Sequence, residues 1–391
     1  MVRITLRSLC PAITGLMVAS AANPAAAHVK WFAPYIVGAA PRPVSSTLAD
    51  PYFWSGIAIA LAFFTATRLI EALGYGERPT RVLNSVTEPL WWRLDDFIRA
   101  TIAAFFIAIF AVGGIYLTPD LKTDSGLVSW VQLAIAVGVF FRVTMPLSAL
   151  GVIWLWLLAL RDYDLFHLLD YLALGLGVAG YLVLASARNP DLRRYRFDLL
   201  RWAVAISLMW SSLEKFAYPE WFYPLVVEKP FLTFGLPRDA FIPMAGVAEF
   251  TLGFGLLSTR LIRRLSAIAL LVIFTAAVFP FGRVDLIGHG LIMAALIVIA
   301  VDRGQEPGRQ PGPARVLVKI PASMAASLLV FAGAYWGTHD MIYDRAPSEV
   351  AGYPATHSPD PDHPHPKGIT VSDHSESELA ARPGDESAIL R

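Results

Sequence analysis

The chain has 391 residues, of which 55% are hydrophobic and only 16% are charged, and its formal net charge is +1. Its mean hydropathy of +0.53 is rarely reached by a soluble protein of this size, so the composition predicts an integral membrane protein. The near-neutral charge gives no case for nucleic-acid binding, and P-loop, serine-hydrolase and zinc-protease signatures are absent from the sequence.

Residues 1–27 have the pattern of a cleavable secretory signal peptide. A basic start is followed by a short apolar stretch and then by Asn23-Pro-Ala-Ala-Ala27, which supplies an A-x-A cleavage site. An uncleaved anchor helix is the alternative. The single cysteine, Cys10, lies inside this segment, so cleavage would exclude thiolate ligands and disulfides from the mature chain. Cleavage would also leave His28 as the first residue of an extracytoplasmic segment, residues 28–52.

Apolar runs near the bilayer length of ~20 residues recur along the chain and predict an all-α polytopic bundle of about ten transmembrane helices. Residues 53–94 would hold the first membrane helix and a cytoplasmic loop, and residues 303–338 a loop and the last helix. Residues 339–391, rich in Pro, Ser, Asp and Glu and including His339, read as a disordered extracytoplasmic tail. The expected helices cover residues 53–73, 97–117, 127–144, 147–161, 164–185, 197–216, 241–259, 263–281, 284–302 and 317–338.

Two features of this helix pattern bear on the path of the chain. Arg142 and Pro146 indicate either a tight turn between the third and fourth helices or a kink in one long helix. Arginines and lysines are concentrated in the loops after the first, fifth, seventh and ninth helices, which the positive-inside rule places in the cytoplasm. We therefore expect a bacterial-type inner (plasma) membrane protein whose mature N-terminus, C-terminal tail and histidines all lie on the extracytoplasmic side.

Residues 95–186 and 197–302 are similar enough to indicate a duplicated four-helix unit. Each unit has an arginine before its first apolar run, a Leu-Ser-Ala word before its third helix, and a histidine after an Asp-Leu step into its fourth helix. These features are Arg99 and Arg201, Leu147-Ser-Ala-Leu150 and Leu265-Ser-Ala-Ile268, and His167 and His289. Because each unit has an even number of helices, we expect the two to pack around a pseudo-twofold axis along the membrane normal, flanked by the first and last helices.

Ionisable side chains gather in the outer half of the second unit. Glu214 and Lys215 end its first helix, and Glu249 lies a little under halfway along its second, with Gln132 near the matching place in the first unit. An ionisable group at membrane depth is costly and is a functional candidate by default. Lys215 and Glu249 would either form an ion pair that fixes helix packing or carry proton chemistry together with Glu214 and His289.

The histidines suggest a metal site as a second possibility. The free amine and imidazole of a mature N-terminal His28 would chelate a metal, most naturally Cu(II), which prefers nitrogen ligands. His167 or His289 would complete the site, with Asp170 or Asp285 orienting that imidazole. The alternative is that His28 is solvated and that the two membrane histidines bridge helices through hydrogen bonds.

The second unit resembles the DoxX-like family of small four-helix membrane proteins, and the first unit resembles it more weakly. The residues that carry the resemblance are Arg201, Glu214-Lys-Phe216, Gly246-Val-Ala-Glu249 with Gly253 and Gly255, and the polar entry from Asp285 to His289. The first unit lacks the Glu-Lys pair and has Gln132 in place of the carboxylate. Members of the family include a subunit of a thiosulfate:quinone oxidoreductase and proteins that assist the maturation of periplasmic redox enzymes, so the resemblance implies an architecture rather than one activity.

Three functions follow as hypotheses. The first is a redox-associated membrane subunit, with a quinone or small acid docking near Glu249, Lys215 and His289. A periplasmic partner would supply the electron centre, because the sequence has no haem, dinucleotide or cluster motif. The second is an extracytoplasmic protein that binds or handles copper or another transition metal. The third is a scaffold in the lipid membrane whose polar residues only hold helices together; the sequence leaves open whether the chain is itself an enzyme.

Overall fold

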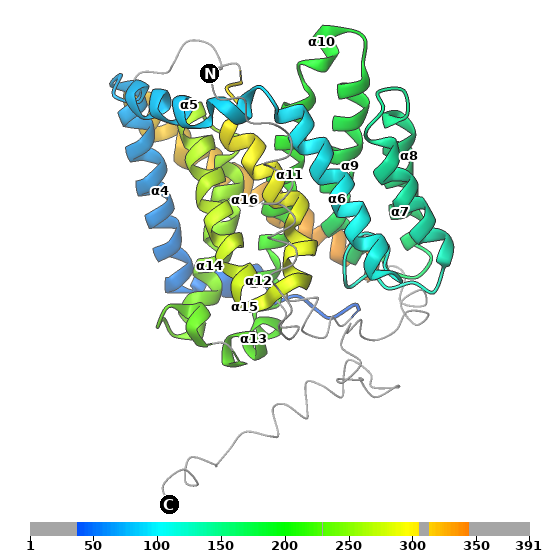
Figure 1. Cartoon of the computed structure of the whole chain (residues 1–391). Helices are drawn as coiled ribbons and strands as arrows, with labels where there is room; N and C mark the ends of the chain where they lie inside the picture. The colour runs from blue at the N-terminus through cyan, green and yellow to red at the C-terminus, as the bar shows by residue number, and fades with distance from the viewer. Residues whose placement is uncertain (1–36, 229, 305–312, 344–391) are drawn as a thin grey trace, which may run out of the picture.

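The computed structural model describes residues 37–228, 230–304 and 313–343. Within these ranges the chain is all-helical, with 81% of residues in helices and no strand. The long helices stand side by side in one bundle, while α5 lies across one end of it (Figure 1). The expected signal peptide, with His28, and the expected tail after residue 343 lie outside the described residues.

A helix is present at each of the ranges expected from the apolar runs. The bundle consists of α4 (Pro51–Ala72), α6 (Leu94–Val112), α7 (Gly126–Gly138), α8 (Met145–Ala159), α9 (Leu165–Ser186), α11 (Arg196–Ser212), α14 (Arg238–Gly255), α15 (Arg260–Val301) and α16 (Pro313–Tyr343). Gly282, with φ 72° and ψ −151°, interrupts α15 at the expected boundary between the eighth and ninth helices. Glycine adopts such a backbone conformation without the cost that a side chain would bring.

Short helices connect the long ones. They are α3 (Val44–Ala49), α5 (Glu77–Trp91), α10 (Pro190–Arg193), α12 (Glu214–Ala217) and α13 (Tyr223–Glu228), with 3-10 turns at Pro219–Phe222 and Pro230–Thr233. Because α5 and α10 lie at one end of the bundle and α12 and α13 at the other (Figure 1), we call these the inner and outer ends. The names follow the orientation expected from the arginines.

Several helices are long and apolar enough to cross a membrane. Among the described residues these are Pro51–Ala72, Leu165–Ser186, Arg260–Val278 and Val318–Tyr343. Gly126–Gly138, Met145–Ala159 and Asp285–Val301 are shorter apolar helices. Apolar side chains such as Trp54, Leu150 and Leu329 point outward and are 53%, 65% and 75% exposed. Together these features fit a multi-pass membrane protein, in which such side chains meet lipid.

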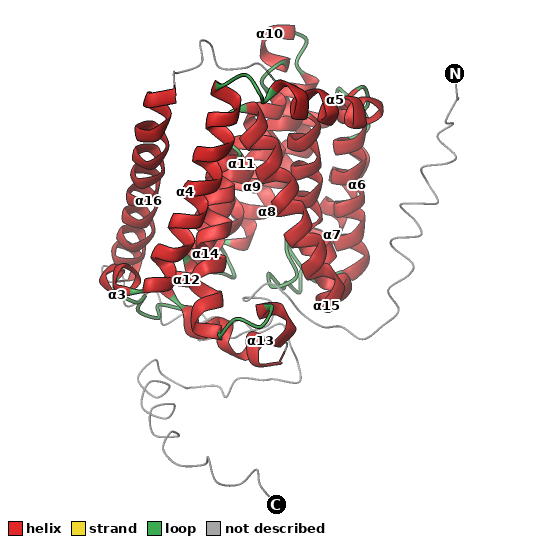
Figure 2. Ribbon diagram, turned by 90° about the vertical axis from the view of Figure 1, so that its left-hand side faces the viewer, coloured by secondary structure: helices red, strands yellow, loops and turns green. Residues whose placement is uncertain are grey.

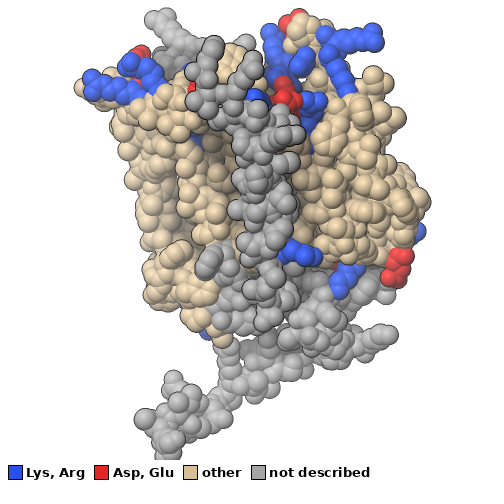
Figure 3. All heavy atoms as spheres, viewed as in Figure 1, with Lys and Arg blue, Asp and Glu red and all other residues tan. Residues whose placement is uncertain are grey.

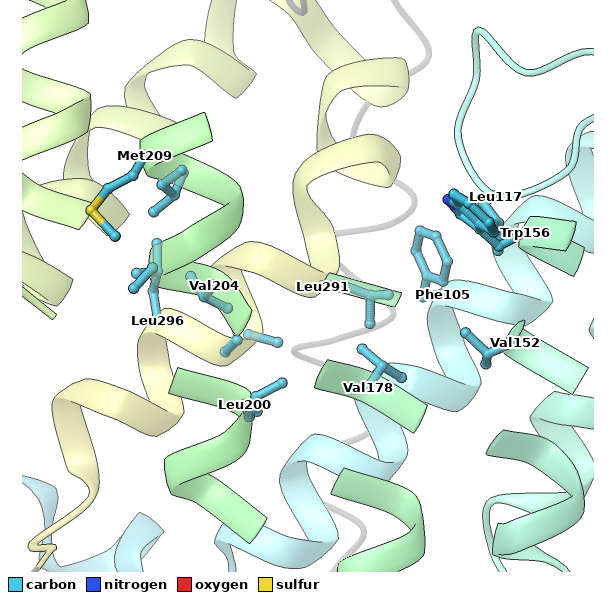
Figure 4. Packing of buried hydrophobic residues seen from close by; sticks show 14 of the residues in the cluster. Phe105, Leu117, Val152, Trp156, Val178, Leu200, Val204, Met209, Leu291 and Leu296 are labelled. Atoms are coloured by element: carbon cyan, nitrogen blue, oxygen red, sulfur yellow. The ribbon is translucent and has the colours of Figure 1, made fainter. Parts of the chain in front are cut away.

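The two expected four-helix units meet along two helix pairs. α9 packs against α11, and α6 packs against α15. The buried core at this junction includes Phe105, Val178, Val204 and Leu291 (Figure 4). The expected flanking helices, α4 and α16, pack against each other beside α14 (Figure 2). The two helices therefore lie on the same side of the bundle.

The inner end is held together by arginines. The fully buried guanidinium of Arg264 donates to the Ala300 carbonyl at 2.6 Å, to Asn84 Oδ1 at 2.5 Å and to Thr87 Oγ1 at 3.1 Å. These bonds fix α5 to α15. A buried guanidinium is tolerated when its donors are satisfied in this way.

Three details differ from the sequence-based expectation or resolve it. Residues 77–91, expected to be part of a loop, form α5. Arg142 lies in a turn between two separate helices, α7 and α8, and its Nε donates to the Ser186 carbonyl at 2.9 Å. His339, expected in the disordered tail, lies in α16 and is only 4% exposed.

Candidate functional site

The Lys215–Glu249 ion pair joins α12 to α14 near the outer end of the second unit. Lys215 Nζ lies 2.5 Å from Glu249 Oε2, and Ser211 Oγ donates to the other carboxylate oxygen at 3.2 Å. Both charged side chains are 20% exposed, so the pair lies at the edge of the packed interior. The expected ion pair is therefore present, and it remains partly accessible from outside the helix bundle.

Aromatic and small residues determine the approach of the two helices around this pair. Lys215 Nζ lies 5.1 Å from the centre of the Phe222 ring, within the range of a cation–π interaction. A Cβ atom at Gly246 would come within 2.8 Å of the Phe216 ring and 3.1 Å of Lys215 Cβ. The absence of a side chain at Gly246 therefore lets α14 approach α12 closely enough for Glu249 to reach the ammonium group.

Glu214 lies next to this pair in sequence but belongs to the buried interior. It is 3% exposed and starts α12, whose backbone closes with a hydrogen bond from Tyr218 N to the Glu214 carbonyl at 2.8 Å. Burial raises the pKa of the Tyr218 hydroxyl, and the negative charges of Glu214, Glu220, Asp164 and Asp170 raise it further. Several carboxylates thus act on one region at the outer end of the bundle.

Two of these carboxylates belong to the first turns of α9. Asp164 caps the helix by accepting a hydrogen bond from His167 N at 3.0 Å, and it also accepts one from the Tyr343 hydroxyl at 2.6 Å. Asp170 accepts a hydrogen bond from Trp210 Nε1 at 3.0 Å. The side chains therefore connect the start of α9 to the ends of α11 and α16.

His167 forms a fully buried polar contact at the outer end. Its Nε2 atom lies 2.8 Å from Asp120 Oδ2, and both side chains are fully buried. The Tyr171 hydroxyl donates to the same carboxylate oxygen at 2.6 Å. Burial would raise the pKa of Asp120, but the hydrogen bond and charge of His167, with the hydrogen bond from Tyr171, lower it to about 2. We call Asp120, His167 and Tyr171 the His167 cluster.

His289 occupies the corresponding position in the second unit but has different surroundings. Its Nδ1 atom lies 2.8 Å from Asp285 Oδ1 on the same helix, and its ring lies 4.8 Å from that of Phe274. The close approach to Asp285 lacks hydrogen-bond geometry, and neither Asp285 oxygen has a hydrogen-bond partner among the described residues. Asp285 is fully buried and lies next to the His289 imidazole.

Gln132, which was expected to match Glu249, holds a loop in place through its side-chain amide. Its side chain is fully buried, and Nε2 donates to the carbonyls of Ile115 and Tyr116 at 2.7 and 2.9 Å. These bonds fasten the loop between α6 and α7, which also contains Asp120. Gln132 therefore holds a loop, whereas Glu249, which it was expected to match, is paired with a lysine.

Of the three expected metal ligands, the structure describes two, His167 and His289. His28 lies outside the described residues, and His167 and His289 each have separate carboxylate neighbours. Among the described residues, no group of three or more His, Asp or Glu side chains has an arrangement that would hold a metal ion. A copper site at this end would therefore depend on His28.

Sequence reasoning missed Asp120, Tyr171 and Tyr343. Asp120 could not be identified from the sequence, because it lies in a short polar loop and the residue it contacts, His167, is 47 positions away in the chain. The one available signal for Tyr171 was its position four residues after His167, on the same helix face. His339 was also misplaced; its Nε2 atom lies 2.9 Å from the Ala39 carbonyl, which ties α16 to the segment before α3.

Comparisons with known proteins returned no match: no family model, no curated protein and no solved structure is significantly similar to this chain.

Proposed function

We propose that the chain is a ten-helix protein of a bacterial-type inner membrane, with its mature N-terminus and C-terminal tail on the extracytoplasmic side. The support is the asymmetry of its charges. Lysine and arginine side chains gather near α5 and α10 on the face seen in Figure 3, at the inner end of the bundle. This distribution agrees with the positive-inside rule if the inner end faces the cytoplasm.

We also propose that the bundle contains two tandem DoxX-like units, residues 95–186 and 197–302. The first and fourth helices of one unit would contact the fourth and first helices of the other, as a pseudo-twofold axis requires. The pairing of α9 with α11 and of α6 with α15 agrees with this arrangement. Leu291, in the second half of α15, and Phe105 of α6 belong to the same buried core, in further agreement (Figure 4).

Matching contacts inside the two units support the duplication. A Cβ atom at Gly138 of α7 would come within 2.3 Å of Ser148 Oγ in α8. In the second unit, a Cβ atom at Gly255 of α14 would come within 2.1 Å of Ser266 Oγ in α15. Both serines belong to the repeated Leu-Ser-Ala word. The same close approach between the second and third helices is thus built from the same residue types.

The start of each unit has a further matching contact. Arg99 pairs with Asp96 at the start of α6, and Arg201 pairs with Asp198 at the start of α11, three residues apart in both cases. Such pairs contribute little to stability when exposed. The matching positions of these two pairs support the proposal that the two units arose by duplication.

For the activity, we propose that the protein is the membrane subunit or accessory of a quinone-linked periplasmic redox system. The observation that carries this proposal is the Lys215–Glu249 pair, because both side chains are partly exposed at the edge of the bundle. Replacing such a pair by well-packed apolar residues is often neutral or stabilising, so packing alone gives little reason to keep the two charges here. Exposure allows the ammonium group to donate a hydrogen bond to a quinone carbonyl oxygen.

The loop between α12 and α14 offers a surface for a ring at the same end. Val227, Phe231 and Phe234 are 64%, 59% and 85% exposed there. Aromatic and apolar side chains at the headgroup level of a membrane are typical of interfacial loops. In the proposed reaction a periplasmic partner gives two electrons to the quinone, and two protons from the outer side complete the quinol. Glu249, together with Glu214 and His289, would relay those protons.

Copper binding is the second candidate, supported by one observation. A carboxylate lies 2.8 Å from a ring nitrogen of both His167 and His289. In metal sites a carboxylate commonly orients the imidazole that binds the ion. For His289 the neighbour is Asp285, as expected, but for His167 the carboxylate on Nε2 is Asp120 rather than Asp170. His28 would have to supply the remaining nitrogen ligands.

The quinone proposal is tested by replacing Glu249 in the native host and measuring quinone reduction by isolated membranes. We expect Glu249→Gln to lower the rate by at least tenfold while the protein remains at its normal level in the membrane. Asp191→Asn, at a carboxylate that is 77% exposed at the inner end, measures the effect of losing a carboxylate away from the pair. Unchanged quinone reduction in the Glu249→Gln membranes would contradict the proposal.

A further inference from the structure

Three of the six residues that line a recess at the inner end of the first unit are arginines. Its volume is about 90 Å³, and its walls are Asp95, Arg99, Arg142, Met145, Ala185 and Arg193. These residues come from five places: the start of α6, the turn between α7 and α8, the start of α8, the end of α9, and α10. The first unit thus forms a basic recess between its own helices and the link to the second unit.

The charges in this recess are unbalanced. Asp95 is already occupied, because Arg196 Nε and NH2 bind its two oxygens at 2.7 and 2.8 Å and Tyr181 donates to Oδ1 at 3.1 Å. Arg99 is paired with Asp96. Arg142 and Arg193 have no carboxylate partner among the described residues, so two positive charges remain at the mouth of the recess.

Hydrogen bonds hold the Arg142 side chain and the Arg193 backbone in place and leave guanidinium donors of both residues unused. Arg142 Nε donates to the Ser186 carbonyl at 2.9 Å and its NH2 group donates to the Ala187 carbonyl, which leaves NH1 available. The Arg193 backbone is fixed by a hydrogen bond from Arg196 NH1 to its carbonyl at 2.8 Å. Its guanidinium group makes no hydrogen bond within the described part of the chain. The guanidinium group of Arg142 is thus held in position, and that of Arg193 has its donors unused, an arrangement suited to binding phosphate oxygens.

The surroundings indicate where that phosphate belongs. Phe140, Phe141 and Val143, in the turn beside Arg142, are 55%, 61% and 88% exposed. Side chains of this kind at the end of membrane helices lie among lipid headgroups and the first carbons of the acyl chains. A soluble phosphate compound has no apolar part to pack against these side chains. A phospholipid has acyl chains that would bury them and add to its binding free energy.

We infer that this recess binds the phosphate of an anionic phospholipid in the leaflet at the inner end of the bundle. Arg142 and Arg193 would contact the phosphate oxygens, and the acyl chains would lie along the exposed apolar surface of α8. Basic recesses between membrane helices on the cytoplasmic side bind anionic lipid headgroups by the same combination of charge and apolar contact. The site is independent of the Lys215–Glu249 pair, which lies at the opposite end.

Native mass spectrometry of the full chain released from nanodiscs tests this inference. The nanodiscs contain equal amounts of phosphatidylglycerol and phosphatidylcholine, and the readout is the phosphatidylglycerol that stays bound. We expect Arg193→Ala and Arg142→Ala each to lower the apparent affinity about fivefold, since one arginine near an anionic surface contributes ~1 kcal/mol. Arg194→Ala is the matched control, because this neighbouring arginine pairs with Asp191 and does not line the recess.

Arg142→Ala removes hydrogen bonds to the end of α9 and could disturb the fold there. Arg193→Ala avoids this problem, because the Arg193 side chain bonds to no other described residue. The inference can therefore be tested with Arg193→Ala alone. Equal retention of the two lipids by the unaltered protein would overturn the inference. An equal loss in the Arg194→Ala control would also overturn it, since binding would then depend on overall charge. Displacement of the lipid by millimolar inorganic phosphate would show that the recess is a site for free phosphate instead.

Discussion

Lys215 and Glu249 are expected to stabilise the protein as a coupled pair. Their charged atoms are 2.5 Å apart, and each side chain is 20% exposed. Breaking a fully buried pair by removing one partner costs ~3–5 kcal/mol, and exposed pairs contribute ~0–1 kcal/mol. At this exposure we expect Glu249→Gln and Lys215→Met each to lower the free energy of unfolding by about 2 kcal/mol.

The double variant separates coupling from two independent losses. When both charges are gone, neither is left without a partner, so part of the loss should be recovered, with a coupling energy of about 1 kcal/mol or more. The assay is denaturant unfolding of the purified protein in mild detergent, followed by tryptophan fluorescence. The exposed Asp191–Arg194 pair, with its atoms 3.7 Å apart and side chains 77% and 52% exposed, is the matched control and should show no measurable coupling. Additive losses for Lys215 and Glu249 would refute the argument.

Three further predictions concern other parts of the chain. The pKa of Asp120 is lowered from 3.8 to about 2 in the folded protein, so it should contribute about 2 kcal/mol of stability above pH 4 that is lost as the pH falls from 4 through 2. Asp120→Asn should abolish this part of the acid dependence of unfolding. Gly255→Ala should destabilise the protein by about 1–3 kcal/mol through overpacking, and more than Gly138→Ala, because a Cβ atom at Gly255 would also come within 2.9 Å of the Phe64 ring. In a chain that ends at residue 345, copper should bind one-to-one, and both His28→Ala and His289→Ala should abolish that binding.

Each of these predictions has a result that would contradict it. An unchanged acid profile in Asp120→Asn would show that the His167 cluster does not control acid stability. Equal effects of the two glycine substitutions would show that the neighbouring side chains relax freely. Copper binding that is absent, or that survives His28→Ala, would remove the metal candidate.

The positions of the long helices could be predicted because their signal is local. Continuous apolar runs near the bilayer length mark the helices from α4 to α16, and the arginine-rich segments mark the ends of these helices. The helix α5 was missed because it lies across the inner end of the bundle. Its apolar residues, including Leu83 and Leu90, follow a helical spacing among polar neighbours, so its average hydropathy is low.

The polar residues of the candidate site were predictable only in part. Glu249 stood out because a carboxylate in an apolar run is costly, and Lys215 was its nearest plausible partner. Asp120 gave no such signal, because a carboxylate in a loop costs nothing until the fold buries it against His167. His339 was assigned to the tail because its contact with Ala39 depends on how the two ends of the described chain meet. Contacts between segments that are distant in the chain cannot be predicted from the local pattern of apolar and polar residues.

The most direct test of the proposed activity is quinone binding at the Lys215–Glu249 pair. The purified full chain in nanodiscs is illuminated with a photoreactive quinone analogue, and the labelled peptides are identified by mass spectrometry. The account predicts labelling in α12, the following loop or α14, competition by unlabelled quinone, and at least tenfold less labelling in the Lys215→Met, Glu249→Gln double variant. Labelling that is absent from these segments, or that is unchanged in the double variant, would contradict it.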